Sequence, residues 1–179
     1  GLSSAPELII NKIRNASAGW AVYSEDVGNQ YQLFLHSTAA AAGPSSAYWN
    51  STSPTSSVFT WGGAMANSSD TVISYCFHSV VGYSKMGSYT GTGASGNSIT
   101  TGFKPAFVMV KRTDVADNWH IHDSTRNPVN PVDKWLYPNL SNAEADVDVL
   151  SFDSNGFTIS STANSTNASG GTYIYMAFA

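Results

Sequence analysis

The apolar residues of this chain occur in short segments of about five residues, and turn-forming residues separate them. Each segment is rich in β-branched or aromatic side chains and is flanked by Gly, Pro, Asn, Ser or Asp, which favours strands over helices. The predicted strands are residues 8–13, 19–23, 31–35, 57–61, 71–77, 107–111, 119–122, 134–137, 149–152, 156–160 and 172–178. We therefore predict an all-β chain, an antiparallel β-sandwich of the jelly-roll or immunoglobulin-like kind.

One hairpin and two weak helical segments complete this pattern. Asn155-Gly156 lies between two apolar runs, and an Asn-Gly pair in that setting is the strongest short-range signal for a tight hairpin. The alanine run at 37–42 is ended by Gly43-Pro44, and residues 142–148 contain helix formers for a single turn. Neither segment predicts a helix long enough to organise the fold.

The chain also contains an internal repeat. Residues 5–12 match 104–111, and residues 19–24 match 118–123 at the same offset, so that Trp20 falls on Trp119. Residues 33–35 also match 135–137, which aligns Leu33 with Trp135. Residues 67–75 match 167–175. Self-similarity of this kind indicates repeated structural units. We predict a first β repeat at 1–78, a connector with one or two strands at 79–103 and a second β repeat at 104–179, each of about 75 residues and cut from a longer array.

The charge of the chain is low and evenly spread. Only 11% of the residues are charged, and the 8 Lys and Arg residues leave a formal net charge of −4. Because nucleic-acid binding requires a basic stripe, we expect no nucleic-acid partner. No apolar run approaches the roughly 18 residues of a spanning helix, so we expect no membrane insertion. The single cysteine, Cys76, can form no internal disulfide and is expected to be a buried, inert thiol.

Four segments of the sequence resemble a known family. They are the strings at 82–91, 101–112, 48–59 and 167–174, which together extend across nearly the whole chain. They resemble a repeat family in predicted tail-fibre and structural proteins of marine bacteriophages. The resemblance implies a component of the virion surface, outside the cell, in contact with other virion proteins. It assigns no catalytic or binding residue.

These observations predict a non-enzymatic virion component, a tail-fibre or appendage module for attachment to the host surface or for spacing. Self-association, as a homotrimer, is expected because exposed strand edges must be covered. A host surface glycan is the expected external partner, and no cofactor is expected. The alternatives are a capsid decoration or head-fibre protein, an extracellular glycan-binding lectin-like domain and, in a different class, a depolymerase.

The acidic residues bear on the depolymerase alternative, because glycoside hydrolysis requires two carboxyl groups close together. Asp123, Glu144 and Asp146 are the acids whose substitution would test that reaction. Most acids of the chain, namely Asp114, Asp117, Asp123, Asp133, Glu144, Asp146 and Asp148, fall in predicted loops. We interpret them as solvated loop residues, with calcium ligation and catalysis as the alternatives.

His120 and His122 form a His-x-His pair, and a strand would direct both rings to one face. Two imidazoles are half of a zinc or iron site, and a trimer axis could gather three such pairs around one ion. The first copy has Ala21 and Tyr23 at the matching positions, which favours a structural role. We therefore predict structural histidines and no metal, with an axial metal as the alternative.

The tryptophans divide into repeated and unrepeated ones. Trp20 and Trp119 occupy matching positions, which predicts that both are buried in the cores of their repeats. Tyr48, Trp49 and Trp61 have no aromatic counterpart in the second copy and border Ser-rich loops. An exposed indole offers a flat apolar face to a sugar or to a protein. We interpret these three residues as core or subunit contacts and, alternatively, as a ligand-binding site with Trp49 exposed.

Overall fold

The computed structural model describes residues 2–179, except for the side chain of Asp148, and divides the chain into two compact units. The first unit extends to His78, and the second comprises Ser79–Ala179. Nearly all regular structure is β-strand, and every strand pair is antiparallel. The prediction of an all-β chain of antiparallel sheets is confirmed.

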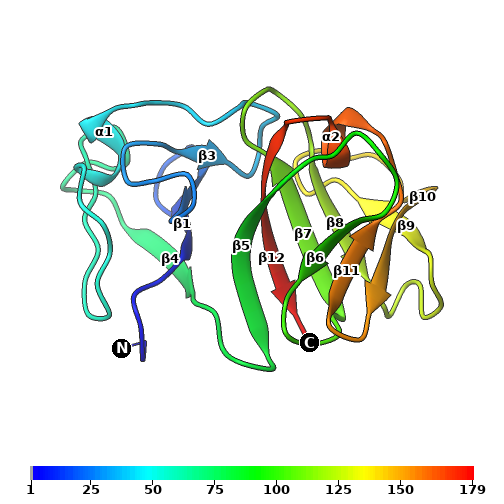
Figure 1. The fold of residues 1–179 in the computed structure, drawn as a ribbon. Coiled ribbons are helices and arrows are strands. Elements are labelled where there is room, and N and C mark those ends of the chain that lie inside the picture. Colours follow the sequence, from blue (N-terminus) through cyan, green and yellow to red (C-terminus); the bar gives the residue numbers. More distant parts are fainter. Residues whose placement is uncertain (1) are drawn as a thin grey trace. The chain divides into compact units, whose positions relative to one another are not determined.

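The first unit contains one four-stranded sheet and a long loop that covers one face of it (Figure 1). Its elements are β1 (Leu8–Ile13), β2 (Trp20–Ser24), β3 (Leu33–Phe34), α1 (Ser46–Trp49) and β4 (Val72–Phe77), and the strand order is β3-β2-β1-β4. Alternation along the strands brings Ile9 and Tyr23 to the covered face, where both pack against Trp49 of the loop. This cluster is the core of the first unit.

The second unit is a single eight-stranded sheet in the order β5-β12-β7-β8-β9-β10-β11-β6. Its elements are β5 (Ser84–Thr90), β6 (Asn97–Thr100), β7 (Phe107–Arg112), β8 (Trp119–Asp123), β9 (Val132–Leu136), β10 (Ala145–Asp153), β11 (Gly156–Ile159), α2 (Asn164–Asn167) and β12 (Thr172–Phe178). The sheet curls until its two edges approach each other (Figure 1). Tyr89 of β5 contacts Phe157 of β11 with ring centroids 6.4 Å apart, and the Asn97 side chain of β6 donates to the carbonyl of Thr90. The result is a near-barrel with an apolar interior.

The two units share one pairing register around their central strands. Strand β1 pairs with β2 so that Leu8 faces Ser24, and β7 pairs with β8 so that Phe107 faces Asp123. On the other side, Leu8 faces Phe77 and Phe107 faces Phe178. The first two strands of each unit therefore correspond residue by residue at the predicted offset of 99, whereas β4 and β12 correspond one residue away from the predicted match, with Phe77 equivalent to Phe178.

Beyond these strands the units differ, so the prediction of two equivalent repeats is not confirmed. The predicted connector, residues 79–103, contains two strands, β5 and β6, but both belong to the eight-stranded sheet of the second unit. The third strand matches with a shift of one residue. Leu33 faces Val22 and Leu136 faces Ile121, so Leu33 corresponds to Leu136, and Trp135 corresponds to Gln32.

Several local predictions differ from the structure. Residues 57–61, predicted as a strand, lie in the loop of the first unit, and residues 142–148 contribute to β10 instead of forming a helical turn. The hairpin at Asn155-Gly156 is present, but Asp153 pairs with Gly156, so Ser154 and Asn155 form its loop. The glycine is needed for a different reason. A Cβ at position 156 would lie 2.0 Å from the carbonyl oxygen of Ile99 in β6, so only glycine allows the strands to approach this closely.

The tryptophans give a direct test of this fold. Trp119 is 1% exposed, as predicted, whereas Trp20 is only half-buried. Trp49 is also 1% exposed, and its indole Nε1 donates to the carbonyl of Tyr31 at 2.9 Å. This agrees with the interpretation of Trp49 as a core residue and contradicts the alternative of an exposed ligand-binding residue, because α1 turns this side chain under the loop onto Ile9 and Tyr23.

We therefore expect Trp49→Ala to lower the free energy of unfolding of the first unit by about 3–5 kcal/mol, through lost apolar contact and a residual cavity. Trp20→Ala should cost clearly less, because part of that side chain already contacts water. Urea unfolding of both variants, followed by circular dichroism, measures the difference. Equal losses for the two variants would contradict the core position of Trp49.

Candidate functional site

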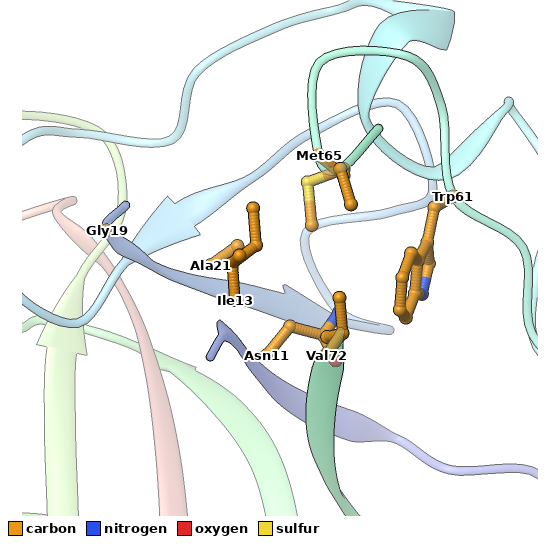
Figure 2. A pocket seen from close by; sticks show the side chains of 8 residues that line it. Asn11, Ile13, Gly19, Ala21, Trp61, Met65 and Val72 are labelled. Carbon is orange, nitrogen blue, oxygen red and sulfur yellow. The ribbon is translucent and has the colours of Figure 1, made fainter. Parts of the chain in front are cut away.

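A hollow on the covered face of the first sheet is the candidate site of the first unit. It is lined by Asn11, Ile13, Gly19, Ala21, Trp61, Met65, Ala66 and Val72, and it has an empty volume of about 230 Å³ including its mouth. Figure 2 shows Trp61 on one side, Met65, Ala21 and Ile13 across from it, and Asn11 and Val72 below. An adjoining hollow of about 420 Å³ shares Gly19, Ala21 and Met65 and extends to Gln32, Phe34 and His36. We call the first the Trp61 hollow and the second the His36 hollow.

The comparison of the two units explains why this space exists. In the second unit, the imidazole of His120 stacks on the indole of Trp135 with centroids 4.2 Å apart, and both rings fill the interior. The shared register places Ala21 and Gln32 at these positions in the first unit. Two large rings are thus replaced by a methyl group and a flexible amide. The hollows are the space that the smaller side chains leave open.

The same comparison identifies Asn11 as an unusual residue. It corresponds to Val110, which belongs to the apolar core of the second unit. Asn11 is 4% exposed, and neither Nδ2 nor Oδ1 has a hydrogen-bond partner among the residues that the structure describes. A buried amide without partners costs about 1–3 kcal/mol of stability. A buried polar group kept at such a cost beside a hollow needs an explanation, which makes Asn11 a candidate site residue.

A second buried amide faces the His36 hollow. Gln32 is 5% exposed, and its Oε1 also has no partner within the described part of the chain. His36 completes this side. Its Nδ1 accepts from the backbone N–H of Trp20 at 2.9 Å, so the neutral ring carries its proton on Nε2. The two hollows therefore combine neutral donors and acceptors with apolar walls, an arrangement typical of sites for uncharged polar ligands.

The position of Trp61 is set by contacts between the loop and α1. Gly62 N–H donates to the carbonyl of Tyr48 at 2.5 Å, and Ala64 N–H donates to the carbonyl of Ala47 at 2.9 Å. A Cβ on Gly62 would lie 2.3 Å from the Ala47 carbonyl, so only glycine permits this approach. Trp61 is 36% exposed. Of the other residues that line the Trp61 hollow, only Gly19 is also exposed. Trp61 thus offers an accessible aromatic face at the mouth.

The structure separates the three predicted ligand-binding residues. Trp61 lies at the hollow, as described. Trp49, the last residue of α1, is buried in the core of the first unit, and Tyr48 is half-buried against the same cluster. Only Trp61 remains in the candidate site. Sequence reasoning missed Asn11 and Gln32, although one signal was present: the repeat alignment sets the polar Asn11 against the apolar Val110.

His120 and His122 lie on one face of β8, as the His-x-His spacing predicted. Both are 0% exposed, the ring nitrogens of His120 have no hydrogen-bond partner in the described chain, and an interaction of His122 with the backbone of Val132 offsets only part of the effect of burial. Burial lowers the pKa of His120 to about 3 and that of His122 to about 4, so both rings are neutral at pH 7. Their stacking on Trp135 accounts for them as interior packing residues.

The acids of the depolymerase hypothesis are partly brought together. Arg126 binds Asp123 and also Glu144, the latter at 2.9 Å from Nη1. Although partial burial of Asp123 opposes ionisation, hydrogen bonds from Arg126 hold its pKa below the ordinary value. A general acid requires the opposite shift. Asp146 is exposed and lies opposite Lys134 in the register of β10 and β9, whereas the Lys134 amine lies 4.0 Å from Glu144.

Comparison with protein families identifies the group to which the chain belongs. A family model described as a domain of unknown function, DUF7483, matches residues 1–179, so the chain is a member of that family. No curated protein and no solved structure matches it. Among residues 2–179, no helix is long and apolar enough to cross a membrane, and no three His, Cys, Asp or Glu residues are grouped to hold a metal ion.

The buried histidines predict how stability depends on pH. In the unfolded chain each imidazole binds a proton near pH 6.5, whereas in the folded unit it does so only near pH 3–4. The unfolded state therefore binds more protons between these values, and stability falls as the pH falls through this window, by up to about 1.4 kcal/mol per pH unit for each histidine. We expect His120→Phe to reduce the slope, because it removes one of the two buried imidazoles. Urea unfolding of the unchanged chain and of this variant at pH 7, 6 and 5 tests this, and equal slopes in the two proteins would refute it.

Proposed function

We propose that this member of the DUF7483 family is a non-enzymatic attachment module whose first unit binds an uncharged, hydroxyl-rich ligand such as a surface glycan. The observation that carries the proposal is the buried, partnerless amide of Asn11 facing a hollow with Trp61 at its mouth. The first unit would then bind the ligand, whereas in the second unit the rings of His120 and Trp135 occupy the equivalent positions.

The chemistry of the hollows favours a sugar over a charged ligand. The side chains facing them are amides, an imidazole, a thioether and hydrocarbons, with no Asp, Glu, Lys or Arg among the lining residues that the structure describes. Sugars present hydroxyls that both donate and accept, which suits Asn11, Gln32 and His36. They also present C–H faces that pack against an indole such as Trp61. A neutral site keeps its affinity at high salt, where charge-based adhesion is screened.

A virion appendage is the setting that we propose for this module, on the basis of the resemblance to tail-fibre and structural proteins of marine bacteriophages. Two successive β units with a common central register are consistent with a chain built by adding units. The carboxylates of Asp123 and Glu144 are engaged by Arg126, which supports a role in structure for them. Self-association as a homotrimer remains part of the proposal.

The binding role of Trp61 is tested by a matched pair of variants. We expect Trp61→Ala to weaken binding of neutral oligosaccharides by about tenfold or more, because an aromatic stacking face is lost. Tyr75→Ala is the control, since Tyr75 is 45% exposed in the same unit but lines neither hollow. Both variants are compared with the unchanged chain on a glycan array and by calorimetry. Equal effects of the two substitutions would remove Trp61 from the site.

A further inference from the structure

We propose that the Trp61 hollow recognises the acetamido group of an N-acetylated sugar. This inference rests on the proposed function and names the ligand class for it. The acetamido methyl enters the hollow, its carbonyl accepts from Asn11 Nδ2, and a neighbouring sugar hydroxyl donates to Asn11 Oδ1. The sugar ring stays at the mouth, against the indole of Trp61.

The size of the hollow is the first argument. The space open to the centre of a water-sized molecule is only about 20 Å³ in the Trp61 hollow, against about 160 Å³ in the His36 hollow. A volume of this size admits one small group, such as a methyl, and excludes a pyranose ring. The ring must therefore lie outside it, where Trp61 is 36% exposed.

The lining is the second argument. Apart from Asn11, the side chains that enclose the hollow are hydrocarbon, thioether or indole, chiefly Ile13, Met65, Val72 and Trp61 (Figure 2). A hydroxyl or a charged group inserted here would lose its hydration against apolar walls. A methyl group loses nothing, and its burial is favourable. The cavity thus selects a substituent that ends in a methyl.

The amide of Asn11 is the third argument. Its Nδ2 and Oδ1 are both buried and both lack partners among residues 2–179, so the complementary ligand must offer an acceptor and a donor close to the methyl. An acetamido carbonyl and an adjacent ring hydroxyl supply this pair. Sites with buried polar groups discriminate strongly against ligands that leave those groups unpaired.

Met65 provides the route of entry. It lines both hollows, and its side chain is unbranched, with three rotatable bonds. Rotation of this side chain can join the two spaces, and some side-chain movement is needed in any case because the Asn11 amide is closed to water in the unliganded structure. Binding therefore requires a side-chain movement and no change in the strands.

The second unit supplies the variant that tests the proposal. Asn11→Val introduces the residue found at the equivalent position, Val110, and removes the unpaired amide. We expect this variant to raise the urea midpoint of unfolding and to lose the preference for N-acetylated sugars. Ala21→Val is a second variant, which fills the hollow from β2 and leaves Asn11 in place. It should also lose the preference.

The experiment measures binding of two tetrasaccharides by titration calorimetry, the β-1,4-linked tetramers of N-acetylglucosamine and of glucose, which differ only in the substituent at carbon 2. We expect the N-acetylated tetramer to bind about tenfold or more tightly to the unchanged chain. Equal binding of the two sugars would overturn the acetamido assignment and leave the glycan-binding proposal standing. No binding of either sugar would overturn both. A preference that persists in folded Asn11→Val would show that the amide is not the recognition group.

Discussion

The pairing of one central strand with neighbours on both sides determines which side chains face the interior of each unit. In each unit that strand, β1 or β7, is bonded in the same register to a hairpin partner and to the last strand of the unit. A shift by one residue would exchange the two faces of the sheet. The register therefore decides that Asn11, Ala21 and Gln32 face one interior, and that Val110, His120 and Trp135 face the other. One backbone pattern produces an open site in one unit and a filled core in the other.

The uncharged character of both interiors follows from their burial. The second unit holds two imidazoles at 0% exposure, and burial keeps them neutral under ordinary conditions. The first unit holds amides, which cannot ionise, at the corresponding depth. Polar atoms remain unpaired in both places, but with different surroundings. The rings are stacked against each other, whereas Asn11 lines the Trp61 hollow, and this contrast distinguishes packing residues from a candidate site.

The sequence predicted the strands well and the side-chain environments less well. Short runs of β-branched and aromatic residues bounded by turn-forming residues located β1 and β12 to the residue. The arrangement of His120 and His122 on one face followed from the two-residue period of a strand. The sequence left two interpretations of Trp49 open, because its burial depends on how the segment around Gly62 folds against α1. The equivalence of Gln32 in the first unit to Trp135 in the second could not be predicted either, because it depends on the register of the third strand in each unit. Long-range packing decides these features, and local pattern does not encode it.

Trp61 lies on a loop, above residues that are fixed in a sheet. The loop and the sheet therefore tolerate amino-acid substitution to different degrees. The floor residues belong to strands whose hydrogen-bonded neighbours constrain every substitution. The loop that carries the indole is attached to the rest of the unit through α1 and a few backbone hydrogen bonds, so its length and composition can vary without disturbing those strands. The loop residue Trp61 can therefore be substituted while the strand residues beneath it keep their places. Under the proposed function, a change of ligand would require changes in this one segment only.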